Sequence, residues 1–212
     1  MHRLRIPISE HRIRSLHIGD LVTLSGVLVT ARDRAHKYLV EQSTTEHSDE
    51  KATVDHLRGW FHEGVIYHCG PIVEQASSGR WKVVAAGPTT SARLEVYQDV
   101  VIDRFGLRAV IGKGGMGQRT QEALCRGGAV YLHALGGAAS LMARSIVDVV
   151  DVIKPEFGGP EALWVLRVSE LQLLVTMDAH GSSLHEQVYF DSARRLSELL
   201  NVGGLSAGSM LR

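Results

Sequence analysis

The chain has 212 residues, of which 44% are hydrophobic, and its 23 Lys and Arg residues balance its 23 Asp and Glu residues. This length and composition suit one globular domain with a single core. The lack of net positive charge argues against a nucleic-acid partner. No apolar run approaches the roughly 20 residues of a membrane helix, and no signal-type segment follows the N-terminus. We therefore expect a cytoplasmic protein with no membrane segment.

The first half of the chain predicts alternating strands and helices. Residues 1–8 alternate in polarity and predict an edge strand, 9–16 predict a short helix capped by Ser9, and 21–30 predict a buried strand. Residues 32–42 carry apolar side chains at helical spacing. Residues 43–55 are polar and charged, and they predict an exposed, flexible loop or a loosely packed helix.

The second half continues this alternation and ends in a Gly/Ser-rich tail, expected to be flexible near 201–212. The expected elements are strands in one sheet at 65–69 and 82–86, a helix at 91–105 ending at Gly106, a strand at 109–111, a helix at 116–125, a strand at 129–132, a helix at 138–147, a strand at 149–153, an antiparallel pair of strands at 162–168 and 171–177, and a helix at 185–200. The fold class that follows is a single mixed α/β domain covering residues 1–212.

The two cysteines, Cys69 and Cys125, lie far apart and outside any Cys-x-x-Cys pattern. They predict buried thiols, because neither a disulfide framework nor a zinc site fits this spacing. A cubane iron–sulfur cluster needs three or four Cys ligands. If such a cluster takes part in the chemistry, another polypeptide must carry it. We also find no cluster of Asp, Glu and His with metal-ligand spacing, so no metal site is expected.

Two arginines stand where a helix is expected to begin, a place where the helix dipole favours acidic groups. Arg32 follows the strand at 21–30, and Arg93 follows the strand at 82–86. An Arg fork matches a carboxylate in bidentate geometry, which indicates an anionic ligand. The alternative for Arg32 is an internal salt bridge to Asp33 or Asp103. His36 lies one helical turn after Arg32, where it could orient the guanidinium or a ligand carboxylate.

Three hydroxyl side chains, Thr89, Thr90 and Ser91, lie just before Arg93 in the run Gly87-Pro88-Thr89-Thr90-Ser91-Ala92-Arg93. Pro88 fixes the turn, and the helix that follows offers free backbone N–H groups to an anion. The alternative is that Thr90 or Ser91 only caps that helix. Thr89 is the hydroxyl less needed as a cap, so it is the stronger candidate for contact with a ligand.

The third cationic motif is Gly112-Lys113-Gly114-Gly115-Met116, which follows a predicted strand. Its glycines leave room for a ligand, and the Lys113 ammonium can reach the same end of the sheet. A phosphate-binding loop is the alternative, but the order Gly-x-x-x-x-Gly-Lys-Ser/Thr is missing. The second Gly-rich stretch, Gly136-Gly137, predicts close helix packing.

These motifs together resemble the beta subunit, or C-terminal domain, of class I iron–sulfur fumarate hydratases and L(+)-tartrate dehydratases. The resemblance spans residues 16–178, and its most specific parts are 30–37, 87–93, 111–116, 131–146 and 158–168. It implies a swivelling β/β/α domain and an alpha subunit that carries a [4Fe-4S] cluster, whose open iron acts as a Lewis acid. It also implies a hetero-oligomer, of which a dimer of heterodimers is one form, and an exposed apolar interface on this chain.

The resemblance further implies roles for single residues. Arg32, Arg93, Lys113, Thr90 and Gly114 would bind a C4 dicarboxylate, and Thr89 would lie next to the proton transfer. A Thr hydroxyl is a poor base, so Thr89 would need an activating carboxylate from the other subunit. His36 and Asp33 would support the binding residues.

Three functions are compatible with the sequence. The first is the beta subunit of a hydro-lyase that interconverts fumarate and malate, or tartrate and oxaloacetate. The second is a stand-alone module that binds a dicarboxylate or phosphate, and the third is a purely structural subunit. The sequence does not choose between fumarate and tartrate, because that choice depends on groups of the alpha subunit.

Overall fold

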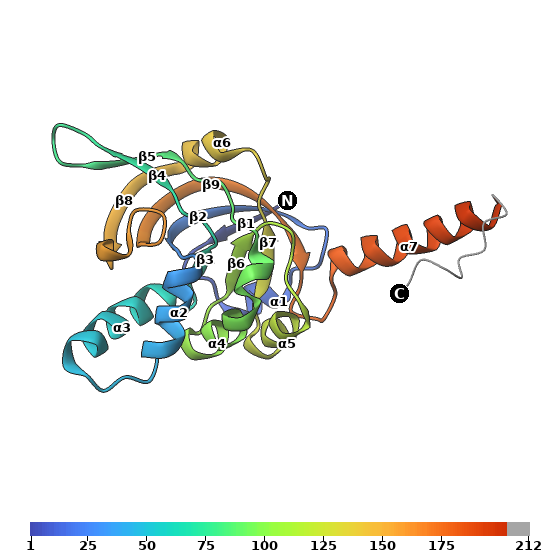
Figure 1. Cartoon of the computed structure of the whole chain (residues 1–212), viewed down its shortest axis with the longest axis horizontal. Coiled ribbons are helices and arrows are strands. Elements are labelled where there is room, and N and C mark those ends of the chain that lie inside the picture. Colours follow the sequence, from blue (N-terminus) through green and yellow to red (C-terminus); the bar gives the residue numbers. More distant parts are fainter. Residues whose placement is uncertain (203–212) are drawn as a thin grey trace.

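The computed structural model describes residues 1–202, which form a mixed α/β domain (Figure 1). Its elements are β1 (His2–Arg5), α1 (Glu10–Arg14), β2 (Leu21–Thr30), α2 (Asp33–Gln42), α3 (Ser48–Phe61), β3 (Val65–Tyr67), β4 (Ile72–Gln75), β5 (Trp81–Ala85), the 3₁₀ helix η1 (Ser91–Leu94), α4 (Glu95–Phe105), β6 (Ala109–Gly112), α5 (Gln118–Gly127), β7 (Val130–His133), α6 (Ala139–Arg144), β8 (Ile146–Ile153), the 3₁₀ helix η2 (Pro155–Phe157), β9 (Leu163–Met177) and α7 (Leu184–Val202). The tail expected near 201–212 lies, from residue 203 onward, outside the described residues.

A seven-stranded sheet organises the domain. Strands β1, β2, β3, β6 and β7 are parallel neighbours, and β9 runs antiparallel to β2, β7 and β8. Because β9 pairs with both β2 and β7, strands β2, β3, β6, β7 and β9 close into a ring. The parallel strands therefore have fixed neighbours on both sides, which holds their carboxyl ends in one place.

Alternation along the parallel strands separates two apolar cores. In β3, Val65 and Tyr67 face one core while Ile66 faces the other, and β6 repeats this with Ile111 and Val110. Successive side chains of a strand point to opposite faces. One core fills the space between the parallel strands and β9, and the other joins the sheet to α2, α3, α4 and α5, which lie together on one side (Figure 1). The layers are β/β/α, as the sequence resemblance implies.

Most expected elements are confirmed within one to three residues. The strand expected at 21–30 is β2, and the helix expected to end at Gly106 does so, with Gly106 in the left-handed region at φ +67°. The expected class, a mixed α/β domain, is therefore confirmed. The polar segment 43–55 forms a turn and the first half of α3, which agrees with the helical alternative for it. The flexibility expected of this segment stays a prediction.

Two expectations about strands are wrong. Residues 162–168 and 171–177 do not form an antiparallel pair but one continuous strand, β9. Ser169 and Glu170 form a bulge, with Glu170 at φ +51°, opposite a register shift between Leu24 and Gly26 in β2. The strand expected at 82–86 lies outside the main sheet, because it pairs with β4 in a separate hairpin.

Helix α7 leaves the body next to β9 and extends away from it (Figure 1). Tyr189 and Phe190, in its second turn, are 70% and 66% exposed. None of the helices in the described part of the chain combines the length and the apolar character that crossing a membrane requires.

Two glycine substitutions should change stability in opposite directions. A Cβ at Gly112, at the end of β6, would overlap Ser91 Oγ and lie 2.7 Å from the hydroxyl of Tyr131, both of them buried. Gly112→Ala should therefore lower the free energy of unfolding by about 3 kcal/mol. A Cβ at Gly59, inside α3, would meet nothing within 4 Å, so Gly59→Ala should raise it by about 0.5 to 1 kcal/mol. Urea denaturation measures both, and equal stability of the two variants would contradict this account of Gly112.

Candidate functional site

The cationic residues predicted from the sequence lie at one edge of the parallel sheet. Arg32 follows the end of β2 by two residues, and Lys113 comes directly after β6. These strands are joined through β3, because Thr30 pairs with Tyr67 and Tyr67 pairs with Ile111. The carboxyl ends of parallel strands meet at the same edge, where α/β sheets commonly bind ligands. The structure therefore brings the Arg32 and Lys113 motifs together.

Residues 88–91 join this edge through their backbone. The Thr89 N–H donates to the His68 carbonyl at 2.6 Å, and the Ser91 N–H donates to the Lys113 carbonyl at 3.1 Å. Thr90 also forms a single parallel bridge with Lys113. Thr89 and Thr90 thus lie between the ends of β3 and β6. Strand β5 of the hairpin ends at Ala85, shortly before this turn. The turn residues themselves form bridges with the residues that follow β3 and β6.

The hydroxyls in this turn do not cap a helix. Thr90 precedes η1, but its side chain makes no capping hydrogen bond, and Ser91 Oγ contacts His68 and Tyr131 instead. The capping alternative for these residues is therefore wrong. Thr89 is half-buried and Thr90 is exposed, and neither hydroxyl has a hydrogen-bond partner within residues 1–202. Both are free to contact a ligand.

The Arg32 guanidinium is held by Glu161 rather than by Asp33 or Asp103. Arg32 Nε lies 3.4 Å from Glu161 Oε1, and both side chains are about a quarter exposed. Glu161 stands just before β9, which is paired with β2 through Val29 and Val165 and so brings these distant residues together. The buried Nε has no hydrogen-bond partner in the described residues. Because this nitrogen is buried, any donor capacity that Arg32 offers to an external anion lies on the terminal nitrogens of its guanidinium.

Arg93 and Asp33 form a second ion pair at the same edge. The guanidinium nitrogen NH2 lies 3.1 Å from Asp33 Oδ2, with the side chains 52% and 45% exposed. This contact joins η1 to the first turn of α2. An ion pair with this exposure contributes at most about 1 kcal/mol. A ligand carboxylate can therefore replace Asp33 at little cost.

Lys113 is the one site cation without a carboxylate partner in the described residues. Its side chain is half-buried and lies against the loop after β7, where a Cβ at Gly136 would be 3.6 Å from Lys113 Cδ. Gly114 has φ +82° and open space around it. Its need for glycine therefore comes from backbone conformation. Gly136, which the sequence placed in helix packing, instead borders Lys113.

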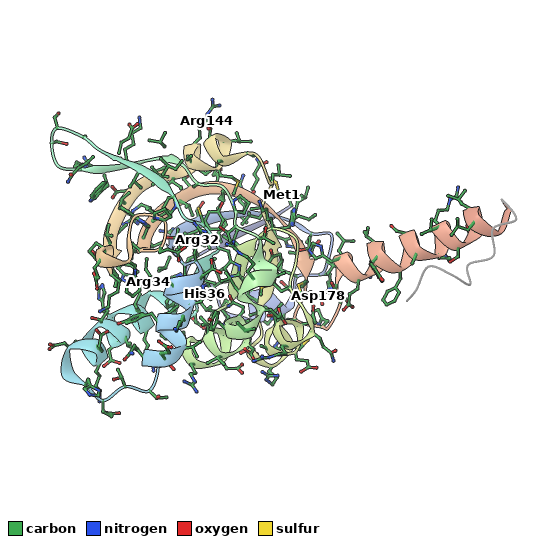
Figure 2. The ribbon with its side chains drawn as sticks, viewed as in Figure 1. Met1, Arg32, Arg34, His36, Arg144 and Asp178 are labelled. Carbon is green, nitrogen blue, oxygen red and sulfur yellow. The ribbon has the colours of Figure 1, made fainter. Side chains whose placement is uncertain are left out.

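Buried polar side chains that were not predicted from the sequence lie beneath this edge and connect to His36. His68, directly after β3, contacts Gln98 and Ser91, and Gln98 in α4 also contacts His36. His36 Nδ1 lies 2.9 Å from the Arg32 carbonyl oxygen. Figure 2 shows Arg32 and His36 near the start of α2. No sequence motif marks His68 or Gln98, because 30 and 62 residues separate Gln98 from its two histidine partners.

Burial governs the charge state of these histidines. It lowers the pKa of His36 and lowers the pKa of His68 well below its ordinary value, since neither imidazole reaches solvent. The proximity of His36 lowers the pKa of His68 further. Both are neutral near neutral pH, so the positive charge of the site resides on Arg32, Arg93 and Lys113.

The described residues contain no group of three His, Cys, Asp or Glu side chains that could hold a metal ion. Cys69 is buried beside the site and Cys125 in α5 is only partly buried, so the expectation of two buried thiols is correct for Cys69 alone. With two cysteines in the whole sequence, the chain does not fit a cubane cluster.

These observations define a class of protein: a β/β/α domain that gathers two arginines, a lysine and two threonine hydroxyls at the carboxyl edge of its parallel strands. The Fumarase C-terminus family model matches residues 2–188, and the chain belongs to this family.

Its relatives include hydratases and dehydratases. The chain is 49% identical over 195 residues to a Geobacillus stearothermophilus protein provisionally named fumarate hydratase class I, covering 92% of this chain and 35% of that protein. It is 37% identical to a Methanocaldococcus jannaschii protein provisionally named L(+)-tartrate dehydratase subunit beta, covering 92% of this chain and 96% of that protein. It is 36% identical to the L(+)-tartrate dehydratase subunit beta of Escherichia coli K12, covering 85% of each chain.

The free energy of unfolding should fall as the pH drops below about 6.5, the ordinary histidine pKa. The folded protein keeps His36 and His68 neutral, whereas the unfolded chain protonates them. The contribution of these histidines to the free energy of unfolding is therefore fully present above their unfolded-state pKa. Below that pKa the free energy of unfolding decreases by up to about 1.4 kcal/mol per pH unit for each histidine. Urea titrations at several pH values between 5 and 8 measure this slope.

The matched variants are His68→Gln and His62→Gln, because His62 is exposed. The slope should be shallower for His68→Gln and unchanged for His62→Gln. Equal slopes for both variants would show that His68 does not carry this pH dependence.

The two thiols should differ in reactivity. Burial raises the pKa of Cys69 to about 12, whereas Cys125 is only partly buried. Because the thiolate is the reactive form, a disulfide reagent should label Cys125 first in the native protein and both thiols after unfolding. Peptide mapping identifies the labelled residue, and faster native labelling of Cys69 would contradict the burial described here.

Proposed function

We propose that this chain is the beta subunit of an iron–sulfur hydro-lyase that adds water to, or removes it from, a C4 dicarboxylate. The observation that carries the proposal is the convergence of Arg32, Arg93 and Lys113 with the Thr89 and Thr90 hydroxyls at one open sheet edge. Fumarate, malate and tartrate all carry two carboxylates, which matches this excess of cationic groups. An alpha subunit would complete the site.

The two ion pairs of the site are weak enough for substrate carboxylates to take the place of Glu161 and Asp33. Glu161 and Asp33 hold Arg32 and Arg93 in partly exposed contacts, each contributing no more than about 1 kcal/mol. A bidentate, charge-assisted pair with a substrate carboxylate in a closed site contributes about 1.5 to 3 kcal/mol. Lys113 has no carboxylate to give up within the described residues. Substrate binding would therefore replace weak internal contacts with stronger ones.

The same groups suit the chemistry of water elimination. A base takes the C3 proton, the C2 hydroxyl departs with its bonding electrons, and the C2–C3 double bond forms. Negative charge develops on the adjacent carboxylate, where Arg and Lys side chains stabilise it. Thr89 would contact the proton-transfer region. Since a Thr hydroxyl does not ionise near neutral pH, a carboxylate of the alpha subunit would activate it.

The cluster in this proposal belongs to the alpha subunit, since Cys69 and Cys125 are the only cysteines here. When bound there, it supplies a Lewis acid for the departing hydroxyl. Two observations support a partner. The chain spans only 35% of the Geobacillus relative, which leaves most of that protein for other parts of an enzyme. The exposed apolar side chains of α7 also begin beside the site, where His185 packs against Gly115.

Replacing Lys113 should abolish most activity of the complex with the alpha subunit. Lys113→Ala removes a cation at the sheet edge, and turnover of fumarate or tartrate should fall on the order of 100-fold or more. Lys51→Ala is the matched control, because Lys51 is an exposed lysine of α3 that pairs with Glu46 and lies outside the site motifs. It should leave turnover unchanged. The absorbance of the fumarate double bond measures the turnover of fumarate.

The isolated chain should show no turnover and only weak dicarboxylate binding by calorimetry. Turnover by the isolated chain would contradict the shared site. Tight binding by it, with no turnover after the cluster-bearing subunit is added, would instead identify a stand-alone binding module. Full activity of Lys113→Ala in the complex would assign a structural role to this chain.

A further inference from the structure

Five buried polar side chains connect Arg32 to the Thr90 turn beneath the candidate site. They come from α2, the residue after β3, η1, α4 and β7. Each is fully buried, and they are His36, His68, Ser91, Gln98 and Tyr131. Gln98 stands in the middle, where its Oε1 position lies 3.0 Å from His36 Nε2 and 2.7 Å from His68 Nε2. One amide group therefore contacts two imidazoles.

One end of this connection reaches Arg32, and the other end reaches the turn that carries Thr89 and Thr90. His36 Nδ1 lies 2.9 Å from the Arg32 carbonyl oxygen, so it contacts the residue that begins α2. His68 Nδ1 lies 2.8 Å from Ser91 Oγ, which also accepts the Tyr131 hydroxyl proton at 2.8 Å. The connection thus links the backbone of Arg32 with the turn that presents Thr89 and Thr90.

Counting donors and acceptors decides the orientation of the Gln98 amide. If its oxygen faces both histidines, each Nε2 must carry a proton, and His36 Nδ1 must also be protonated because the Arg32 carbonyl only accepts. His36 would then be a fully buried cation. The carboxylates that face it, Asp33 and Glu161, are already engaged by Arg93 and Arg32. The Gln98 amide nitrogen would also remain buried without a partner.

Turning the amide by 180° keeps these distances and removes the conflict. The amide nitrogen then donates one N–H to each Nε2, and each histidine is neutral with its proton on Nδ1. His36 Nδ1–H donates to the Arg32 carbonyl, and His68 Nδ1–H donates to Ser91 Oγ, which has two lone pairs and also accepts from Tyr131. Only neutral groups, the Gln98 oxygen and the Ser91 hydroxyl proton, stay without a partner. Burying these costs less than burying an imidazolium.

We propose that Gln98 is a positioning residue whose amide N–H groups hold His36 and His68 as neutral Nδ1–H tautomers, which fixes Arg32 relative to the Thr89–Thr90 turn. The tautomers follow from the buried contacts of this chain alone. The effect on catalysis rests on the proposed function, because it concerns substrate held between Arg32 and this turn. A shift of about 1 Å between binding groups is enough to change rates substantially.

Nitrogen NMR of the full chain tests the tautomers directly. Long-range ¹H–¹⁵N spectra of protein labelled with ¹⁵N-histidine distinguish Nδ1–H, Nε2–H and doubly protonated rings, and His36→Gln and His68→Gln assign the two signals. Both rings should be Nδ1–H tautomers at pH 7. An Nε2–H tautomer at His68, or two protonated nitrogens at His36, would overturn the proposal.

Gln98→Glu supplies a second spectroscopic test, because a carboxylate only accepts hydrogen bonds. In this variant His68 should change to the Nε2–H tautomer, and His36 should hold two protons. Unchanged histidine signals in Gln98→Glu would also overturn the assignment.

Kinetics of the complex with the alpha subunit test the positioning role. Gln98→Met keeps the length of the side chain but removes its donors, and it should raise the KM for the dicarboxylate on the order of 10-fold or more. Gln121→Met is the control, since Gln121 in α5 bonds the Asp178 carbonyl outside this connection. An unchanged KM in Gln98→Met would overturn the positioning role while leaving the proposed function intact. A wild-type complex that turns over no dicarboxylate would instead contradict the proposed function, and the tautomers would still stand.

Discussion

The site depends on the insertion of residues 88–91 between the ends of β3 and β6. Two backbone hydrogen bonds, from Thr89 to the His68 carbonyl and from Ser91 to the Lys113 carbonyl, place this turn in line with the parallel strands. Thr89 and Thr90 then stand beside Lys113, and η1 begins where Arg93 can reach Asp33. Because these bonds use only the backbone, the hydroxyls of Thr89 and Thr90 stay free, while Ser91 Oγ turns inward to His68 and Tyr131. The ring of strands closed by β9 keeps the accepting carbonyls in place.

The polar side chains around this turn form two layers, a charged one at the surface and a neutral one beneath it. At the surface, Arg32 and Arg93 hold exposed or partly exposed carboxylates that a ligand can replace. Beneath it, fully buried His36, Gln98 and His68 form a layer in which ionisation is unfavourable. The positive charge of this region therefore lies on Arg32, Arg93 and Lys113 and not on the buried histidines.

The sequence was sufficient where a local pattern determines a local structure. Apolar β-branched residues predicted β2, Gly106 predicted the end of α4, and the motifs around Arg32, Thr89 and Lys113 predicted groups that the fold brings to one edge. It failed where distant pairing decides the outcome. The polar pair Ser169 and Glu170 resembles a turn, yet pairing with β2 on both sides keeps β9 continuous. The Glu161 partner of Arg32 and the contact of Gln98 with two histidines likewise exist only after folding.

This sheet edge should hold a dicarboxylate when a cluster-bearing subunit closes over it. A crystal structure of that complex with a bound C4 dicarboxylate tests it most directly. We expect the substrate carboxylates to lie within hydrogen-bonding distance of Arg32, Arg93 and Lys113, with the Thr89 hydroxyl next to the carbon that loses its proton. A dicarboxylate bound elsewhere, with Arg32 and Arg93 still paired to Glu161 and Asp33 and Lys113 facing solvent, would contradict the account.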